Sequence, residues 1–369
     1  MLLAIDLLKL WEEKDKPTME LWEMMNKWVY EGFNSTYKSI GVNFDKNYYE
    51  SETYLLGKEN IKNGLNNNLF YKKDDGSVWV DLSNEKLDNK ILLRSDGTSV
   101  YITQDIGTAI KRFKDFPNIK KQIYTVGNEQ DYHFKVLFKI LEKLGYEWAK
   151  ECYHLSYGMV DLPDGKMKSR EGNVVDADDL VNHMIKTAKI RTEELGKIDD
   201  FDSDDLIDLY NKIALGALKY YLLRVDPKKK MLFDPDESID FHGNTGPFIQ
   251  YTYARICSII RRAETLNIEY ANYNIDDLEN ISLKQKKIID HIFQFPNIIE
   301  ISSDSYSPSL ISQFAYDLAK LFNSFYQDEK IIDGKNNETT SFKIALSHLT
   351  SVTIKNSLEL LGVDVPKKM

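Results

Sequence analysis

The sequence predicts two parts of different class: an α/β part with a parallel, doubly wound sheet, and an all-α part that follows it. Short apolar runs alternate with helical patterns from about residue 50 to 176, whereas nearly everything after that reads as helix. In the first part, the strand-like run 121–127 precedes an amphipathic helix and a second strand-like run, 152–160. Strand, helix and strand in that order form a βαβ unit, whose two strands are parallel.

Length and composition indicate a globular protein of more than one domain. The chain has 369 residues, of which 42% are hydrophobic and 29% charged. No apolar run approaches the roughly 20 residues that span a bilayer, so we expect no membrane partner. Cys152 and Cys257 form no CxxC pair, which favours a reducing cytoplasm and argues against a structural metal such as zinc. The net charge of −10 means that any nucleic-acid partner must meet a local basic or aromatic surface.

The α/β part offers four strand candidates and one clear helix. The strand candidates are SVWVDL (77–82), VYIT (100–103), KQIYTVG (121–127) and CYHLSYGMV (152–160). The helix is DYHFKVLFKILEKLG, whose apolar residues fall at helical spacing and whose last residue, Gly145, suits a C-terminal cap. In the segment 95–109 we expect Thr103 to cap a helix and to place Asp105 in its first turn.

The all-α part has clear helix starts and stops. Asp176 is expected to cap a helix that runs to Gly196, and 204–225 reads as a long amphipathic helix. Pro247 stands where a first helical turn should begin, after GNTG. Two stretches rich in polar residues are expected to be loops, 264–283 and 333–340.

Polar side chains gather at the carboxyl ends of the predicted strands, where parallel sheets bind ligands. The segment 128–133 follows a strand and opens a helix, whose free N–H groups attract anions; the alternative is a capping turn with Asn128 or Asp131 as the cap. We expect Tyr101 and Asp105 to face one pocket, in which a carboxylate would pair best with a guanidinium group. The alternative is that Asp105 only favours the helix dipole.

A basic loop, DGKMKSREGN (164–173), follows the last predicted strand. Gly165 and Gly172 flank a concentration of lysines and hydroxyls, the usual groups for binding a polyphosphate. These residues alone do not establish a phosphate-binding site, because basic loops are usually solvated surface.

The helix after Pro247 carries two stripes of side chains. Apolar residues at spacings of four, three, four and three should face the core: Ile249, Tyr253, Ile256, Ile260 and Ala263. A second stripe on another face is aromatic and basic: Tyr251, Arg255, Ser258 and Arg262. Unstacked RNA bases stack on aromatic rings and guanidinium planes. The alternative is an ordinary helix with a half-buried tyrosine and solvated arginines, and DPKKKM (226–231) adds a further basic cluster for phosphates.

Taken together and in this order, the segments resemble the arginyl-tRNA synthetases, a family of class I aminoacyl-tRNA synthetases. GKMKSREGNVV resembles the family's Lys-Met-Ser-Lys-Ser signature, and SDGTSVYITQDIGTA resembles its arginine-binding segment. VGNEQDYHF is similar to the strand, loop and helix that follow. GNTGPFIQYTYARICSIIRRA is similar to the start of the anticodon-binding helical domain, and LLGVDVPKKM to the carboxyl end. The resemblance covers nearly the whole chain and implies an arginine–tRNA ligase, which activates L-arginine with ATP and transfers it to its tRNA.

The resemblance also implies roles for individual residues. Three would surround the arginine side chain, with Asp105 on the guanidinium: Tyr101, Asp105 and Gln130. ATP, with Mg²⁺ as part of that substrate, would be bound by His133, by the backbone of Gly158, Met159 and Val160, and by Lys166, Met167, Lys168 and Ser169. Lys166 and Ser169 would serve catalysis by steadying the phosphates. The tRNA would be contacted by Phe248, Tyr251, Arg255, Tyr326 and Met369.

The implied fold is the second half of a class I Rossmann-type domain with a helical-bundle anticodon-binding domain. Its parts would be a connective region (1–90), the Rossmann-type half (91–185), a helical stem (186–240) and the anticodon-binding domain (241–369). We expect a cytoplasmic monomer.

Two features depart from the family pattern. Ser169 stands where the signature has its second lysine, with Lys168 one place earlier. The six histidines contain no His-x-x-His pair, so the family's His-Ile-Gly-His motif is absent from these residues. We therefore expect a carboxyl-terminal portion of the enzyme, which binds tRNA weakly and alone lacks ATP–pyrophosphate exchange. The alternative function is that of a non-catalytic tRNA-binding fragment or paralogue.

Overall fold

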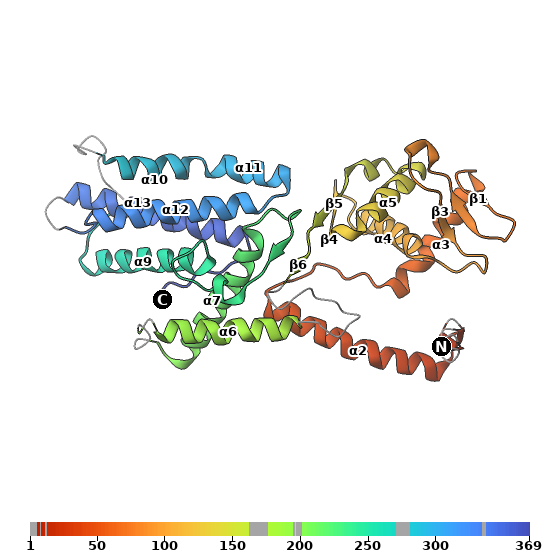
Figure 1. Cartoon of the computed structure of the whole chain (residues 1–369), viewed down its shortest axis with the longest axis horizontal. Coiled ribbons are helices and arrows are strands. Elements are labelled where there is room, and N and C mark those ends of the chain that lie inside the picture. The colour runs from red at the N-terminus through yellow and green to blue at the C-terminus, as the bar shows by residue number, and fades with distance from the viewer. Residues whose placement is uncertain are drawn as a thin grey trace.

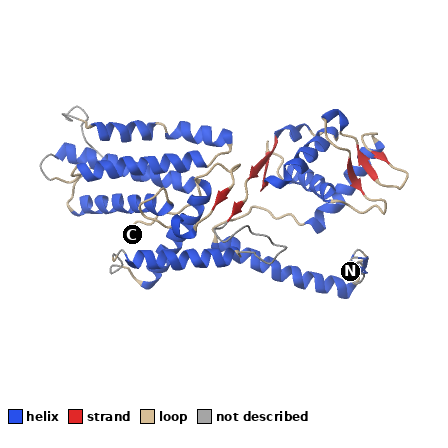
Figure 2. Ribbon diagram, viewed as in Figure 1, coloured by secondary structure: helices blue, strands red, loops and turns tan. Residues whose placement is uncertain are grey.

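The computed structural model describes residues 6–7, 9–11, 13–161, 176–194, 196, 201–270, 281–333 and 337–369. These residues form an elongated molecule with a mixed lobe at one end and a bundle of helices at the other (Figure 1). Two long helices, α2 (Lys16–Ser39) and α6 (Ala177–Glu194), run along one side of both lobes and contact each other. Strands lie in the mixed lobe and at its junction with the bundle (Figure 2).

The mixed lobe contains two small sheets and three helices. An antiparallel sheet has the order β1 (Tyr71–Lys72), β2 (Val78–Val80) and β3 (Lys90–Leu93). The helices are α3 (Glu50–Asn66), α4 (Tyr101–Asp115) and α5 (Asp131–Lys143). β4 (Gln122–Gly127) pairs in parallel with β5 (Cys152–Tyr157) across α5, in a register from Gln122–Cys152 to Gly127–Tyr157. The predicted βαβ unit is confirmed, as is the turn at Gly145, which has a φ of 88°.

The predicted strand at 100–103 is wrong, because α4 begins there. Val100 is the N-cap residue, and Thr103 lies inside the first turn instead of capping the helix. The first turn contains no acidic residue, so the prediction that Asp105 lies in it is wrong. The Thr103 hydroxyl is buried and donates to the carbonyl of Leu92. β-Branched residues favour strands, but here they begin a helix that packs closely on α3: at Gly57 a Cβ atom would clash with the carbonyl of Thr103.

The helical part begins with three helices beside a short sheet and continues as a bundle. The three helices are α6, α7 (Ser203–Leu223) and α8 (Pro235–Ser238), and in the short sheet β6 (Val160–Asp161) is parallel to β7 (Met231–Leu232). The bundle contains α9 (Gly246–Thr265), α10 (Leu283–Phe293), α11 (Phe295–Ser305), α12 (Ser309–Asp328) and α13 (Asn337–Leu360). Asp176 accepts from the Asp178 N–H at 2.8 Å, which confirms the predicted cap.

One predicted loop is partly wrong. The stretch 333–340 was expected to be irregular, but α13 begins at Asn337. Thr340 and Ser341 are buried against the bundle, and the Ser341 hydroxyl donates to the carbonyl of Glu269 at 2.6 Å. Polar residues here belong to a packed helix because nearby segments accept hydrogen bonds from their hydroxyls: Asp333 from Thr340, and the Glu269 carbonyl from Ser341.

The core of the bundle confirms the apolar stripe predicted for α9. Ile249, Tyr253, Ile256 and Ala263 are buried against α12 and α13, and Ile260 is partly buried beside them. Within the described residues, no helix is long and apolar enough to cross a membrane. In the same residues, no group of three or more His, Cys, Asp or Glu side chains is arranged to hold a metal ion.

Candidate functional site

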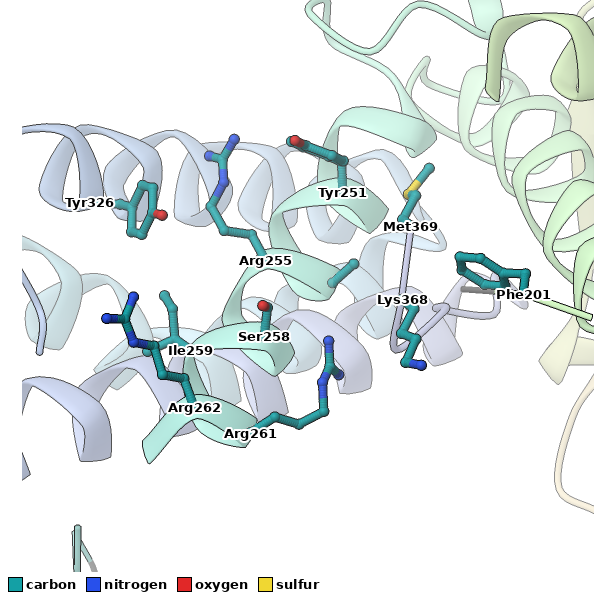
Figure 3. A pocket seen from close by; sticks show the side chains of 11 residues that line it. Phe201, Tyr251, Arg255, Ser258, Ile259, Arg261, Arg262, Tyr326, Lys368 and Met369 are labelled. Carbon is teal, nitrogen blue, oxygen red and sulfur yellow. The ribbon is translucent and has the colours of Figure 1, made fainter. Parts of the chain in front are cut away.

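A pocket on one face of α9 collects most of the residues predicted to bind RNA (Figure 3). This α9 pocket has a volume of about 940 Å³ and is lined by Phe201, Tyr251, Ala254, Arg255, Ser258, Ile259, Arg261, Arg262, Tyr326, Lys368 and Met369. Four of the lining residues are cationic and none is acidic, although the whole chain carries a net charge of −10. The pocket is therefore a local basic surface on an acidic protein.

Arg255 lies at the centre of the aromatic part of this pocket. Its guanidinium carbon is 4.9 Å from the ring centroid of Tyr251 and 5.1 Å from that of Tyr326. The guanidinium also donates to the Asn323 side-chain oxygen. Each cation–π contact contributes about 0.5–1 kcal/mol at an exposed site. Arg255 is thus held in one orientation, with its planar group beside two rings.

Local sequence explains how these side chains come together. Thr245 caps α9 through the Phe248 N–H at 3.3 Å, and Pro247 occupies the first turn. The second stripe recurs every three or four residues, so it lies on one face of the helix. Tyr326 arrives from α12, and the carboxyl-terminal residues Lys368 and Met369 close one side.

Four of the five residues predicted to contact tRNA line the α9 pocket: Tyr251, Arg255, Tyr326 and Met369. Phe248 does not, because its ring packs on Tyr316 with centroids 5.5 Å apart, at the edge of the bundle core. The prediction missed Phe201, Arg261 and Lys368. The sequence held a signal for two of them, since Arg261 precedes Arg262 and the chain ends in two lysines and a methionine.

The second group of predicted residues lies at the carboxyl ends of β4 and β5. His133, on the first turn of α5, places Nε2 2.7 Å from Oδ2 of Asp105 on α4. The Asp105 side chain is 43% exposed, so a ligand can still reach its carboxylate. Gln130 is exposed in the short turn before α5. The structure therefore makes partners of two residues that were assigned to different ligands.

Tyr101 lies one helical turn before Asp105 on α4. The residue is 78% exposed and lines an aromatic cleft of about 1100 Å³ beside α2, together with Trp11, Trp22, Tyr30 and Tyr54. Asp105 is not among the residues that line this cleft. The alternative considered for 128–133, a turn capped by Asn128 or Asp131, is wrong. Gln130 is the N-cap residue of α5, no side chain caps this helix, and Oδ1 of Asp131 lies 3.2 Å from Nδ1 of His154.

The backbone predicted to meet adenine is partly engaged with the basic segment 226–231. The Gly158 N–H donates to the carbonyl of Pro227 at 2.7 Å, and the Met159 carbonyl accepts from the Met231 N–H at 3.2 Å. Gly158 has to be glycine here, since a Cβ would clash with the carbonyl of Lys229. Lys166, Met167, Lys168 and Ser169 lie outside the described residues.

Family models divide the chain in the same two parts. Residues 3–234 match "tRNA synthetases class I (R), catalytic domain", and residues 249–369 match "DALR anticodon binding domain". The curated "Arginine--tRNA ligase" of Flavobacterium psychrophilum is 55% identical over 361 residues, which are 97% of this chain and 59% of that protein. The protein of the same name from Bacteroides thetaiotaomicron is 52% identical over 99% of this chain and 61% of its own. The chain thus spans about three fifths of the length of these relatives.

Solved structures agree on the fold. An arginyl-tRNA synthetase from Thermus thermophilus superposes with a TM-score of 0.78 at 20% identity, over 99% of this chain and 69% of that one. An arginyl-tRNA synthetase from Plasmodium falciparum superposes with a TM-score of 0.79 at 22% identity, over 98% of this chain and 60% of that one.

Proposed function

Because the chain belongs to the arginyl-tRNA synthetase family, with a class I catalytic domain before a helical anticodon-binding domain, we propose that it functions in arginine–tRNA ligation. The reaction is the ATP-dependent activation of L-arginine and its transfer to the cognate tRNA. The observation that carries the proposal is the Arg255 guanidinium, which lies between Tyr251 and Tyr326 in a pocket without acidic residues. Rings and guanidinium planes of this kind stack unpaired RNA bases, and cations meet phosphates.

The proposed arginine site comprises Tyr101, Asp105 and Gln130. Asp105 supports this role because its carboxylate is half-exposed and oriented by His133 at 2.7 Å. A carboxylate held at one oxygen can still offer the other to a guanidinium group. The roles of Tyr101 and Gln130 rest on the resemblance and on their exposure.

The proposed ATP site comprises His133, the backbone of Gly158 to Val160, and Lys166 to Ser169. Two backbone groups, the Gly158 N–H and the Met159 carbonyl, already bond to residues 227–231, so the contact with adenine falls to the other backbone groups there. Mg²⁺ would arrive with ATP as part of the substrate. Lys166 and Ser169 would stabilise charge on the phosphates, and positioning of this kind supplies much of the acceleration in phosphoryl chemistry.

We also propose the division into parts at residues 90, 185 and 240, and action as a monomer in the cytoplasm. Cys152 and Cys257 are both free thiols, as suits a reducing compartment. The second candidate function, tRNA binding without ligation, is favoured by one observation, the absence of a His-x-x-His pair from the sequence.

Two measurements test the proposal. This chain should bind a tRNA with an arginine anticodon at least about tenfold more tightly than one with an unrelated anticodon, and Arg255→Ala should remove the difference. Arg191→Ala, at an exposed site on α6, should not. Equal affinity for both tRNAs would contradict anticodon recognition. Arginine-dependent ATP–pyrophosphate exchange by the full-length enzyme then separates the ligase from the RNA-binding alternative.

A further inference from the structure

We propose that a second pocket, between α9 and α13, binds another nucleotide of the same RNA; the inference rests on the proposed function. This α9–α13 pocket has a volume of about 500 Å³. Residues of both helices and of the carboxyl-terminal tail line it, among them Tyr253, Cys257, Ile260, Arg261, Tyr270, His348, Val352, Lys355 and Lys367. None of the residues predicted from the sequence to contact tRNA belongs to it.

The walls of this pocket suit a base. The rings of Tyr270 and His348 lie 5.8 Å apart at an angle of 51°, so they form two sides of a corner. Ile260 and Val352 add apolar surface. Every base has a π-face, and stacking on such surfaces tolerates any sequence. A pocket of this size and lining can therefore hold one planar ring system.

Its charges suit a phosphate. Arg261, Lys355 and Lys367 all line the pocket, against a single acidic lining residue, Glu264. Lys355 is 49% exposed and only 3.4 Å from Glu359, a surface ion pair that contributes little and can exchange for a phosphate. A base on the rings with its phosphate on these cations describes a nucleotide.

Arg261 connects the two pockets. It lines both, and its Nη1 donates to the carbonyl of Lys367 at 3.0 Å. Lys367 lines the α9–α13 pocket, while the next residue, Lys368, lines the α9 pocket. Arg261 and the tail thus form a cationic ridge between the pockets. An RNA strand that places one base beside Arg255 can cross this ridge and place a neighbouring nucleotide in the second pocket.

The test uses this chain and an RNA hairpin that carries the anticodon loop of an arginine tRNA. The double variant Lys355→Gln/Lys367→Gln should weaken binding about threefold to tenfold and lower the salt slope of log Kd by about 0.7 for each phosphate that the variant no longer neutralises. The matched control is Lys286→Gln/Lys287→Gln, which removes the same charge from exposed positions on α10. A second variant, Tyr270→Ala/His348→Ala, should weaken binding about fivefold or more without changing that slope.

The outcomes separate this inference from the function on which it rests. Suppose the hairpin binds and Arg255→Ala weakens it, but the pocket variants match the control. The second pocket is then overturned and the proposed function stands. Failure of the unmodified chain to bind the hairpin overturns both. A 2-aminopurine placed on either side of the loop gives an independent readout, because its fluorescence should rise on Tyr270→Ala/His348→Ala at one loop position and at no other.

Discussion

Tyr153 of β5 stacks on Tyr306 at the end of α11, with ring centroids 4.4 Å apart and ring planes 23° apart. This contact joins the mixed lobe directly to the helical bundle. Tyr306 adopts a left-handed conformation with φ 52° and ψ 39°, which a bulky residue rarely takes. α12 begins three residues later and carries Tyr326 of the α9 pocket in its last turn. α12 therefore connects Tyr326, in the proposed RNA site, to Tyr306, which contacts β5.

The first prediction concerns this stack. Tyr306→Ala loses the aromatic pair, worth about 0.5–1.5 kcal/mol, and keeps most of the backbone strain, so the free energy of unfolding should fall by about 1 kcal/mol. Tyr306→Gly also loses the pair but relieves strain of about 1–2 kcal/mol, so the unfolding free energy should change by less than about 1 kcal/mol. Denaturant titration measures both. Equal losses in the two variants would mean that the left-handed backbone stores no strain.

The second prediction concerns amino-acid recognition. In the full-length enzyme, Asp105→Asn removes the charge that we assign to the arginine guanidinium, so kcat/KM for arginine in ATP–pyrophosphate exchange should fall at least about tenfold, or 1.4 kcal/mol. The control is Asp304→Asn, which removes the same charge from an exposed position on α11. Unchanged arginine kinetics in Asp105→Asn would remove this residue from the site.

The third prediction concerns the basic loop 164–173. In the full-length enzyme, Lys166→Ala should slow formation of the arginyl adenylate far more than it weakens tRNA binding, because the lysine is assigned to phosphates of ATP. Single-turnover assays measure the first quantity and filter binding the second. If tRNA affinity falls while activation holds, the loop is an RNA contact and not a catalytic one.

The fourth prediction concerns the α9 pocket. Tyr251→Ala and Arg255→Ala should each weaken tRNA binding, because stacking one base is worth about 1–3 kcal/mol. Phe248→Leu serves as the contrast: its ring packs on Tyr316, so this change should lower stability and leave the affinity for tRNA unchanged. Titration of labelled tRNA, with thermal melting alongside, separates the two effects. Loss of affinity in Phe248→Leu alone would reverse the assignment.

The fifth prediction compares two helical glycines. Gly57→Ala places a Cβ against the carbonyl of Thr103. It should destabilise the mixed lobe by about 1–3 kcal/mol, the usual cost of overpacking. At Gly32 on α2, no atom lies within 4 Å of the position that a Cβ would take, so Gly32→Ala should stabilise the chain by about 0.5–1 kcal/mol. Thermal unfolding gives the sign of each change. Gains in both variants would show that α3 and α4 do not pack this closely.

The sequence by itself determined the class of each part and the grouping of the aromatic and basic stripe on α9. Periods of two and of 3.6 residues reveal strands and helices wherever one face is apolar, which is why β4, α5, β5 and α9 were all predicted. The stripe that holds Tyr251 and Arg255 follows from helical spacing alone, since residues three or four apart share a face. Family motifs supplied the proposed roles of Asp105 and Gln130, which spacing could not assign.

Only the tertiary structure decided what lies opposite those residues. Residues 100–103 read as a strand because Val, Ile and Thr favour strands, yet in the structure they begin α4, and Thr103 packs against Gly57 of α3. Three contacts were likewise not predictable from the sequence, because each joins residues far apart in the chain. They are His133 with Asp105, Tyr326 with Arg255, and Tyr306 with Tyr153. A local pattern records which side of a helix or strand is apolar, but it carries no information about the segment that packs against it.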